Sequence, residues 1–508
     1  MYLTALLAAP FAAALLACFG SGRDGAAASR LALVLALVVA ALGVPLVTCL
    51  TAPAEVEHAW FALVGTNAVV QFSLASDGLT AWLIQLVTFL VPVALLASRD
   101  QVGERMREFA VAVLVMEGLM IGALLARDLV LFYVCFEAML IPMVVLMALF
   151  GGADRRGAAL QFFLYTMLGS VGLLVAIWYI AQNLQTTSLK ELIDHGMLAT
   201  LERGEQLALF AAFALAFAVK VPLAPFHGWQ ARAYAECPTG AVVLLSGAMA
   251  KLGTYGLIRF VLPLFPALSV EYANWFIVLG LIGVIAGALM AWAATDVKRL
   301  IAFSSLSHLG LVVVGIFTFS DLALKGAAVQ MVAHGISVAA LFVLVGAIES
   351  RSLKRGLDDF GGLAGRMPIL ATLFIAAVLA SAALPGTANF AGEFLLLMGI
   401  FDPKQWWIAA IAGLSTILTA IYLLRLVQRW FYGPRRADLA ALPDLGVREV
   451  VAVAPLIALS LCFGLYPKPI SDQAGVTASK LGAEARRIAS GAPAPVAVVE
   501  TKDAHAAR

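Results

Sequence analysis

Long apolar stretches alternate with short polar connections along almost the whole chain. Each stretch is close to the ~20 residues that cross a bilayer as an α-helix. The stretches lie at residues 2–18, 31–53, 78–98, 108–126, 128–150, 157–182, 206–225, 239–262, 273–294, 299–318, 323–347, 367–398, 405–431 and 447–467. The pattern predicts an all-α polytopic membrane protein with about 14 transmembrane helices.

The two ends of the chain differ from each other. No Lys or Arg precedes the first apolar stretch, so we expect a retained helix rather than a cleaved signal peptide. Residues 468–508 are rich in Ala and Pro with mixed charges, and we expect this tail to be mobile or to lie along the surface.

Two of the apolar stretches are interrupted. Pro222 and Pro225 follow Lys220 in the seventh, and Leu384-Pro385-Gly386 lies inside the twelfth, which is too long for one plain crossing. Proline removes a backbone hydrogen bond and breaks a helix. The two breaks are five helices apart, so a repeat of five crossings has its second copy upside down, because five is odd. Inverted repeats with broken helices at matching positions are typical of transporters.

The expected organisation therefore has five parts. They are N-terminal helices 1 to 3 (1–107), a first five-helix repeat (108–262), a second, inverted five-helix repeat (273–431), a last helix (432–467) and a C-terminal tail (468–508).

Basic residues are distributed unevenly between alternate connections. The odd-numbered connections hold Arg23, Arg30, Arg99, Arg105, Arg107, Arg155, Arg156, Arg232, Lys298, Arg299, Arg351, Lys354, Arg355, Arg366, Arg435 and Arg436. The even-numbered ones hold Arg127, Lys190, Arg203, Lys325 and Lys404. Positive charge marks the cytoplasmic side. Both termini are therefore expected on the periplasmic face of a bacterial inner membrane.

Composition narrows the function classes. With 62% hydrophobic residues and a mean hydropathy of +0.97, the chain is no soluble globule. The net charge of +2 gives no electrostatic case for binding nucleic acid. The five cysteines form no CxxC or His/Cys metal spacing, and the glycines form no dinucleotide-binding loop.

Charged residues inside the apolar stretches carry the functional signal. A lysine at the centre of a membrane helix costs about 2.5–3.5 kcal/mol on insertion scales, yet Lys220 and Lys251 both lie deep in the apolar pattern. Glu137 sits halfway along its stretch and Glu117, a weaker candidate, lies one helix earlier. A group that can be neutral or charged is a suitable proton carrier. Each proton-carrier role has a structural alternative. Glu137 could serve only as the partner of a cation on a neighbouring helix, and the side chain of Lys220 could extend to the membrane surface.

Three further residues extend this set. His308 and His334 occur mid-helix in adjacent stretches, with serine hydroxyls nearby, and histidine relays protons near neutral pH. The alternative for each histidine is a structural role as a hydrogen-bonded residue of the core. Glu393 follows the second break, where freed backbone groups and Asn389 offer a wet environment. By contrast, His227 and Glu236 fall in a predicted loop as ordinary solvated residues.

The segments around these residues resemble the antiporter-like membrane subunits of respiratory complex I, and within that group the M-type subunits. The matching segments are FYVCFEAMLIPM (Glu137), AFAVKVPLAPFHGW (Lys220), LLSGAMAKLGTYGLIRF (Lys251), TDVKRLIAFSSLSHLG (His308), MVAHGISVAALF (His334) and LPGTANFAGEF (Glu393). The glutamate at 393 distinguishes the M type, because the comparable position in L-type subunits resembles lysine.

The resemblance implies a proton-translocating subunit of NADH:quinone oxidoreductase, with each repeat forming a half-channel. Glu137 and Lys220 would form a coupled pair, Lys251 the central relay, His308 and His334 its continuation, and Glu393 the exit. This chain would hold no cofactor or metal. NADH, FMN, iron–sulfur clusters and quinone would belong to partner subunits, with L- and N-type subunits as membrane neighbours.

One segment departs from the family pattern. Where the family reads something like HTWLPDAHVEAPTAGS, this chain has Arg232 in place of the aspartate and Tyr234 in place of the second histidine. The departure leaves the intramembrane lysines unchanged and concerns only residues 227–240.

Two other functions compete with this interpretation. One is a subunit of a multi-subunit sodium/proton antiporter or of a membrane-bound hydrogenase. The other is a structural spacer that joins pumping subunits and moves nothing, which the five deep charges argue against.

Overall fold

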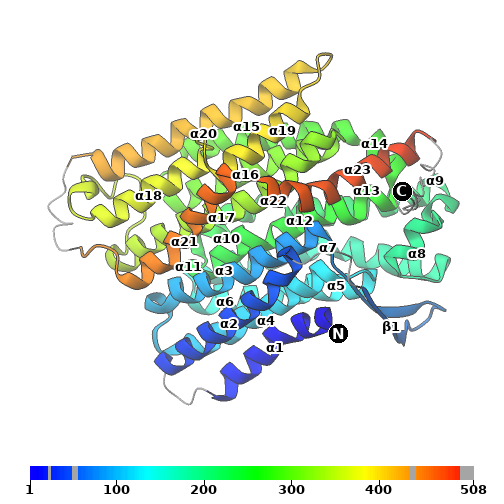
Figure 1. The fold of residues 1–508 in the computed structure, drawn as a ribbon, viewed down its shortest axis with the longest axis horizontal. Helices are drawn as coiled ribbons and strands as arrows, with labels where there is room; N and C mark the ends of the chain where they lie inside the picture. Colours follow the sequence, from blue (N-terminus) through cyan, green and yellow to red (C-terminus); the bar gives the residue numbers. More distant parts are fainter. Residues whose placement is uncertain (21–24, 49–54, 435–441, 492–508) are drawn as a thin grey trace, which may run out of the picture.

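The computed structural model describes residues 1–20, 25–48, 55–434 and 442–491. Helices dominate and run side by side along the long direction of the molecule (Figure 1). The spans are α1 (Tyr2–Gly20), α2 (Gly25–Thr48), α3 (Gly78–Val102), α4 (Met106–Leu125), α5 (Leu129–Ala138) with α6 (Leu140–Phe150), α7 (Arg155–Leu184), α9 (Arg203–Lys220), α11 to α13 (Thr239–Leu264), α15 (Ala273–Ala293), α16 (Val297–Phe317), α17 (Asp321–Ser352), α18 (Pro368–Ser381) with α19 (Ala388–Ile400), α20 (Trp406–Tyr432) and α21 (Val447–Leu465). The predicted all-α membrane fold is confirmed.

Eleven stretches of the described chain are long and apolar enough to cross a membrane, with α3 and α4 forming one continuous stretch. The helix α9 is not among them; it carries Arg203, Glu205 and Lys220. The helices α18 and α19 are the two short halves of a broken span. The eleven stretches hold twelve crossings, because one of them contains both α3 and α4. With α9 and the α18–α19 pair, the described residues contain the fourteen predicted crossings.

The first break follows from the chemistry of Pro222. Proline has no N–H, so the carbonyl of Ala218 accepts a hydrogen bond from the N–H of Leu223 instead, at 2.8 Å. The carbonyl of Val219 thereby loses its helical partner and accepts from the indole N–H of Trp229, at 3.0 Å. Both carbonyls that the proline disturbs are therefore satisfied inside the protein, as an apolar environment requires.

The second break lies between α18 and α19 and also centres on a proline, Pro385. Two residues beside it have left-handed backbone angles, Ala383 with φ 56° and Gly386 with φ 95°. Gly464 of α21 packs against this segment so closely that a Cβ atom there would lie 2.2 Å from the Gly386 carbonyl oxygen. The glycine is needed for that close approach.

Two further interruptions were not predicted. The fifth span divides at Met139 into α5 and α6, where Pro142 cannot donate to the carbonyl of Ala138. The eighth span contains two π-helical turns, η3 (Leu245–Met249) and η4 (Leu257–Val261), on either side of the short helix α12 (Lys251–Gly256). Such turns change the register of a helix and free backbone groups for other partners.

The connections are more ordered than the sequence suggested. Strands β1 (Glu55–Ala62) and β2 (Val69–Ala75) form an antiparallel hairpin between α2 and α3. Shorter helical elements are η1 (Gly103–Arg105), α8 (Leu189–Asp194), η2 (Met197–Thr200), α10 (Gln230–Glu236), α14 (Pro266–Glu271) and η5 (Leu363–Gly365). The segment 227–240, predicted as a loop, therefore contains the helix α10.

The start of the tail is helical. It forms α22 (Lys468–Ile470), the π-helical turn η7 (Ser471–Gly475) and α23 (Val476–Ala489). The helix α23 lies against α13, α14 and α17, with Ala478 and Ala485 fully buried. Residues 492–508, the rest of the predicted tail, lie outside the described residues.

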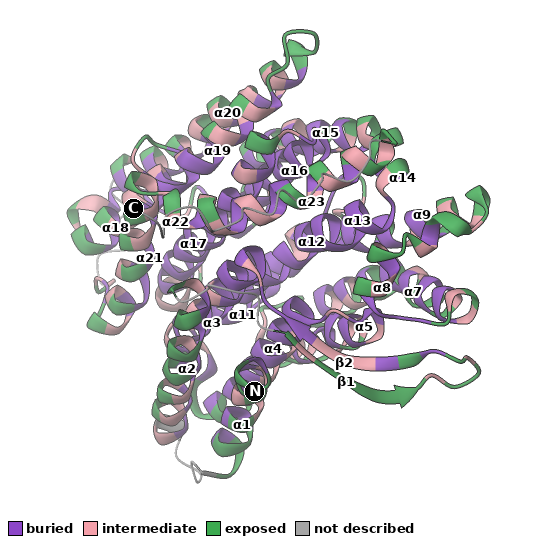
Figure 2. Cartoon of the chain, turned by 45° about the vertical axis from the view of Figure 1, so that its right-hand side comes forward, coloured by how far each residue is buried: buried purple, intermediate pink, exposed green. Residues whose placement is uncertain are grey.

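Burial is concentrated in a few central spans (Figure 2). The most apolar windows of α17 and of the eighth span are completely buried, and that of α16 is 94% buried, whereas those of α1 and α20 are each 33% buried. Three of the deep polar residues predicted from the sequence, Lys251, His308 and His334, lie on these central spans. The peripheral spans present apolar surface to their surroundings.

Candidate functional site

Lys251 is held at the start of α12 by the π-helical turn before it. The N–H of Ala250 bonds to the carbonyl of Leu245 at 3.1 Å and not to that of Ser246, its partner in an α-helix. The Ser246 carbonyl instead accepts from the Lys251 ammonium at 2.5 Å. The ammonium also lies 2.8 Å from Nδ1 of His334. The π-turn therefore supplies a backbone acceptor for a buried cation.

From His334 a series of neighbouring titratable side chains continues to the second break. The rings of His334 and His308 have centroids 5.4 Å apart. Nδ1 of His308 lies 3.0 Å from Oε1 of Glu393, although the angle is not that of a hydrogen bond, and within the described chain neither ring nitrogen has a hydrogen-bond partner. Lys251, His334, His308 and Glu393 thus form one continuous series of neighbours, which we call the central relay.

Neutral polar residues complete the far end of the central relay. The amide of Gln330 donates to Oε1 of Glu393 at 3.3 Å, and the hydroxyl of Thr416 donates to Oε2 at 3.2 Å. Asn389 donates to Ser337 at 3.0 Å. Sequence reasoning missed Gln330 and Thr416, because single uncharged residues in apolar helices give no distinctive pattern.

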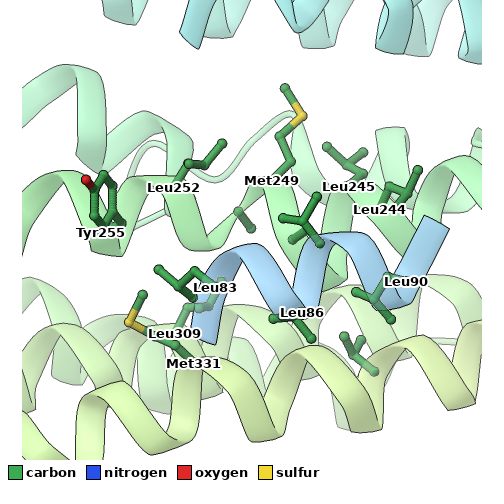
Figure 3. Packing of buried hydrophobic residues seen from close by; sticks show 14 of the residues in the cluster. Leu83, Leu86, Leu90, Leu244, Leu245, Met249, Leu252, Tyr255, Leu309 and Met331 are labelled. Atoms are coloured by element: carbon green, nitrogen blue, oxygen red, sulfur yellow. The ribbon is translucent and has the colours of Figure 1, made fainter. Parts of the chain in front are cut away.

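A close helix approach brings the first two members of the central relay together. A Cβ atom at Gly335, next to His334, would lie 2.7 Å from the carbonyl oxygen of Gly247. Small residues allow membrane helices to pack at this distance. Leu86 and Leu90 of α3 lie over the same contact, Leu90 beside Gly247 and Leu86 beside Gly335. Figure 3 shows Leu86 and Leu90 on α3, which runs alongside the helix that carries Leu244, Leu245 and Met249. The link is consequently covered by apolar side chains.

Lys220 and Glu137 form a looser arrangement in the first repeat. Lys220 is the last residue of α9 and is 3% exposed. Its ammonium lies over the ring of Phe136, 4.6 Å from the centroid, within electrostatic reach of Glu137. Glu137 is half-buried, and Oε1 of its carboxylate has no hydrogen-bond partner among the described residues. The predicted pair is adjacent in space but not bonded.

The two lysines flank one helix crossing without touching. A Cβ at Gly253 would lie 2.7 Å from the backbone nitrogen of Val221, so α9 and α12 are in close contact there. Apolar side chains, including Phe217, fill this crossing. In the described part of the chain no polar side chain bridges Lys220 to Lys251, so the structure joins the central relay but separates it from the Glu137–Lys220 pair.

Glu117 is completely buried on α4 and joins neither group. Both oxygens of its carboxylate lack a hydrogen-bond partner within the described residues.

An ionic cluster lies at one end of the molecule, around α10. Arg355 pairs with Glu236 at 2.7 Å, with Asp296 at 2.6 Å and with Glu349 at 3.4 Å. The prediction that Glu236 is an ordinary solvated residue is wrong, since it is buried. Burial raises the pKa of its carboxyl, but the hydrogen bond and charge of Arg355 outweigh this, and the pKa lies below its usual 4.5.

The divergent segment is explained by its contacts. Arg232 forms an ion pair with Asp154 at 2.5 Å and donates to Gln161 at 2.9 Å. Tyr234 is buried against Trp229 and Phe342. Both substituted residues therefore contribute to packing at this end of the fold.

A second ionic cluster lies near the β-hairpin. Asp77 caps α3 and pairs with Arg127 at 3.1 Å and with Arg259 of η4. Arg127 also donates to the hydroxyl of Tyr255 at 3.2 Å. No pattern in the sequence joins these residues, which come from three separate segments, with Tyr255 and Arg259 in the same span. Across the residues that the structure describes, no group of three or more His, Cys, Asp or Glu side chains is placed to hold a metal ion.

Comparison with known proteins identifies similar chains. Residues 126–419 match the family model described as NADH:quinone oxidoreductase/Mrp antiporter, TM. NADH-quinone oxidoreductase subunit M of Rhodobacter capsulatus is 40% identical over 422 residues, covering 81% of this chain and 82% of that protein.

Two solved structures have the same fold. A chain of respiratory complex I from Thermus thermophilus with bound NADH is 30% identical, with a TM-score of 0.82, over 95% of this chain and 99% of that one. A chain of the Mrp complex from Dietzia sp. DQ12-45-1b has a TM-score of 0.83 at 23% identity, over 96% of this chain and 98% of that one. The second likeness concerns the fold alone.

Proposed function

The chain belongs to the NADH:quinone oxidoreductase/Mrp antiporter transmembrane family, and we propose that it is a proton-translocating subunit in the membrane arm of an NADH:quinone oxidoreductase. The observation that carries the proposal is the central relay. It consists of Lys251, His334, His308 and Glu393, all buried and each beside the next.

In this mechanism protons move along the central relay by exchange between neighbours. His334 Nδ1 is placed to accept a proton from the Lys251 ammonium across their 2.8 Å contact. His308 is next to His334 and carries the proton to Glu393. Histidine suits this step because one ring nitrogen can accept a proton while the other donates one.

The Glu137–Lys220 pair is the point at which energy from neighbouring subunits enters this chain. Moving one charge against the membrane potential takes about 2.3 kcal/mol per 100 mV, and this chain carries no redox group in the proposal. Glu137 is half-buried beside the exposed residues Val134 and Ile141, so a neighbouring subunit can draw its carboxylate away from Lys220. NADH, FMN, iron–sulfur clusters and quinone belong to partner subunits, and L- and N-type subunits are the membrane neighbours.

The organisation proposed for the chain is the one expected from its sequence. Residues 108–262 and 273–431 form two inverted repeats, each a proton half-channel. The breaks after Lys220 and before Glu393, five spans apart, support this. The chain is a multi-pass membrane protein. We place it in the bacterial inner membrane with both termini periplasmic; both described ends lie on the side of the β-hairpin (Figure 1).

The proposal is tested with the assembled complex in membrane vesicles. Replacing Lys251 and Glu393 together by alanine should stop NADH-driven proton translocation, because both ends of the central relay are removed. Lys404→Ala, at an exposed lysine, is the control and should have no effect. Normal proton stoichiometry in the double variant would instead support a structural spacer. A sodium-dependent pH change without NADH would support an antiporter.

A further inference from the structure

The ammonium of Lys220 has an unusual environment for a buried cation. It lies 4.6 Å from the centroid of the Phe136 ring, and both residues are buried. Among the described residues, no hydrogen bond or ion pair to its side chain is formed, in contrast to the two contacts of the Lys251 ammonium. A buried cation without partners is strongly unfavourable, so the ring face is the contact that stabilises it.

The ring and the carboxylate of the proposed pair are consecutive residues. Phe136 and Glu137 lie in the last turn of α5, just before the interruption at Met139. Their side chains leave the helix about 100° apart, and the lysine side chain has four rotatable methylene groups. The ammonium can therefore pass from the ring face to the carboxylate by changes in its own rotamer.

We propose that Phe136 is a positioning residue for proton translocation, whose ring face holds the protonated Lys220 while Glu137 is drawn away. The inference rests on the proposed function. An aromatic ring carries partial negative charge on its face, and its attraction for a cation is larger where water is excluded. The ring thus keeps Lys220 protonated between release from Glu137 and delivery of the proton.

Other charged groups do not provide this stabilisation. Of the titratable residues on helices packed against α9, Glu137 on α5 is the one whose charge acts on Lys220. The other titratable groups on these packed elements are Tyr133 and Cys135 on α5, Arg155, Arg156, Tyr165 and Tyr179 on α7, Lys251 and Tyr255 on α12, and Arg259 on η4. None of these groups acts electrostatically on Lys220. When Glu137 moves, Phe136 is the remaining partner.

The ring is held firmly in place. Phe136 stacks on Phe132 with centroids 5.2 Å apart and meets Phe217 edge-on at 5.9 Å. Phe132 is equally buried but has no cation over its face in the described part of the chain. Phe132 is therefore a matched control for any change made at Phe136.

The test replaces Phe136 in the assembled complex by phenylalanines with one, two and three fluorines. These keep the shape of the ring and weaken its attraction for cations step by step. The measurement is the pH dependence of NADH-driven proton translocation in vesicles. With each fluorine, the pH at which the translocation rate falls on the alkaline side of the profile (the alkaline limb) should decrease, because the protonated form of Lys220 is destabilised. The decrease for the full series should be about 0.5–1 pH unit. The same series at Phe132 should leave the profile unchanged.

A second pair of variants tests the inference in case the chains with fluorinated phenylalanine do not assemble into the complex. Phe136→Leu should shift the alkaline limb in the same direction, and Phe136→Tyr, which keeps the ring face, should restore it. An unchanged profile for all Phe136 variants would overturn the inference, while loss of pumping in Lys220→Ala would still support the proposed function. Full pumping in Lys220→Ala would overturn the proposed function itself.

Discussion

The two halves of the candidate site use similar residues in different ways. In the central relay, Lys251 contacts the Ser246 carbonyl and His334 directly. In the first repeat, Lys220 lies over an aromatic ring and close to a carboxylate that it does not bond. The Lys251 ammonium is therefore satisfied by two partners, whereas the Lys220 ammonium has no hydrogen bond or ion pair among the described residues. Unsatisfied buried groups are sensitive to small displacements, so the first repeat is the better place for an outside signal to act.

The largest expected effect concerns the loosely held pair. Lys220→Ala, or Glu137→Ala, should lower NADH-driven proton translocation and the linked quinone reduction by at least about 10-fold, since the coupled pair is lost. The complex should still assemble, because no ion pair joins the two side chains within the described residues and the cost of losing either one is local. Coupled activity near that of the unmodified complex in either variant would overturn the proposed function and, with it, the distinction between the two halves.

A smaller effect is expected from loosening the tightly bonded half. Gly335→Ala adds a Cβ atom 2.7 Å from the carbonyl oxygen of Gly247 and 2.7 Å from the Leu86 side chain, which is too close for either contact. Separation of α17 from η3 would lengthen the Lys251–His334 contact and should slow translocation about 10-fold or less. Gly283→Ala is the control, because its Cβ would meet its nearest neighbour at an ordinary 3.8 Å. Equal rates for both variants would show that this helix approach does not position the central relay.

The smallest effect is expected outside both halves, at the ionic cluster around α10. The lowered pKa of Glu236 stabilises the fold above its usual value of 4.5, and this contribution is lost as the pH falls below that value. Glu236→Gln should cost about 1–2 kcal/mol at pH 7, less than for a fully buried pair, because Arg355 keeps Asp296 and Glu349 as partners.

The measurement is the Tm of the complex in nanodiscs at pH 7 and pH 4. The difference between the unmodified and Glu236→Gln chains should shrink at the lower pH, while proton translocation at pH 7 stays nearly unchanged. Glu104→Gln, at an exposed carboxyl, should leave Tm unchanged at both values. A pH-independent difference would show that the charge of Glu236 is not what stabilises this end of the fold.

The sequence by itself determined the spans, the two principal breaks and the identity of the deep charges. Apolar stretches of bilayer length, and prolines beside Lys220 and before Glu393, are local signals that depend on chain composition and on the missing proline N–H. For the same reason the interruption at Met139 was in principle readable from Pro142. The π-turns were not, since they depend on which backbone groups find partners in the folded state.

Only the tertiary structure decided which charges meet. Lys251, His334, His308 and Glu393 lie on four spans, and their contact depends on close helix packing at positions such as Gly247 and Gly335. The same packing leaves Lys220 over Phe136 and away from Lys251, although both lysines have the same depth pattern in the sequence. Hydrophobicity places a helix in the membrane, but the shapes of the packed side chains determine which of its faces meets which neighbour.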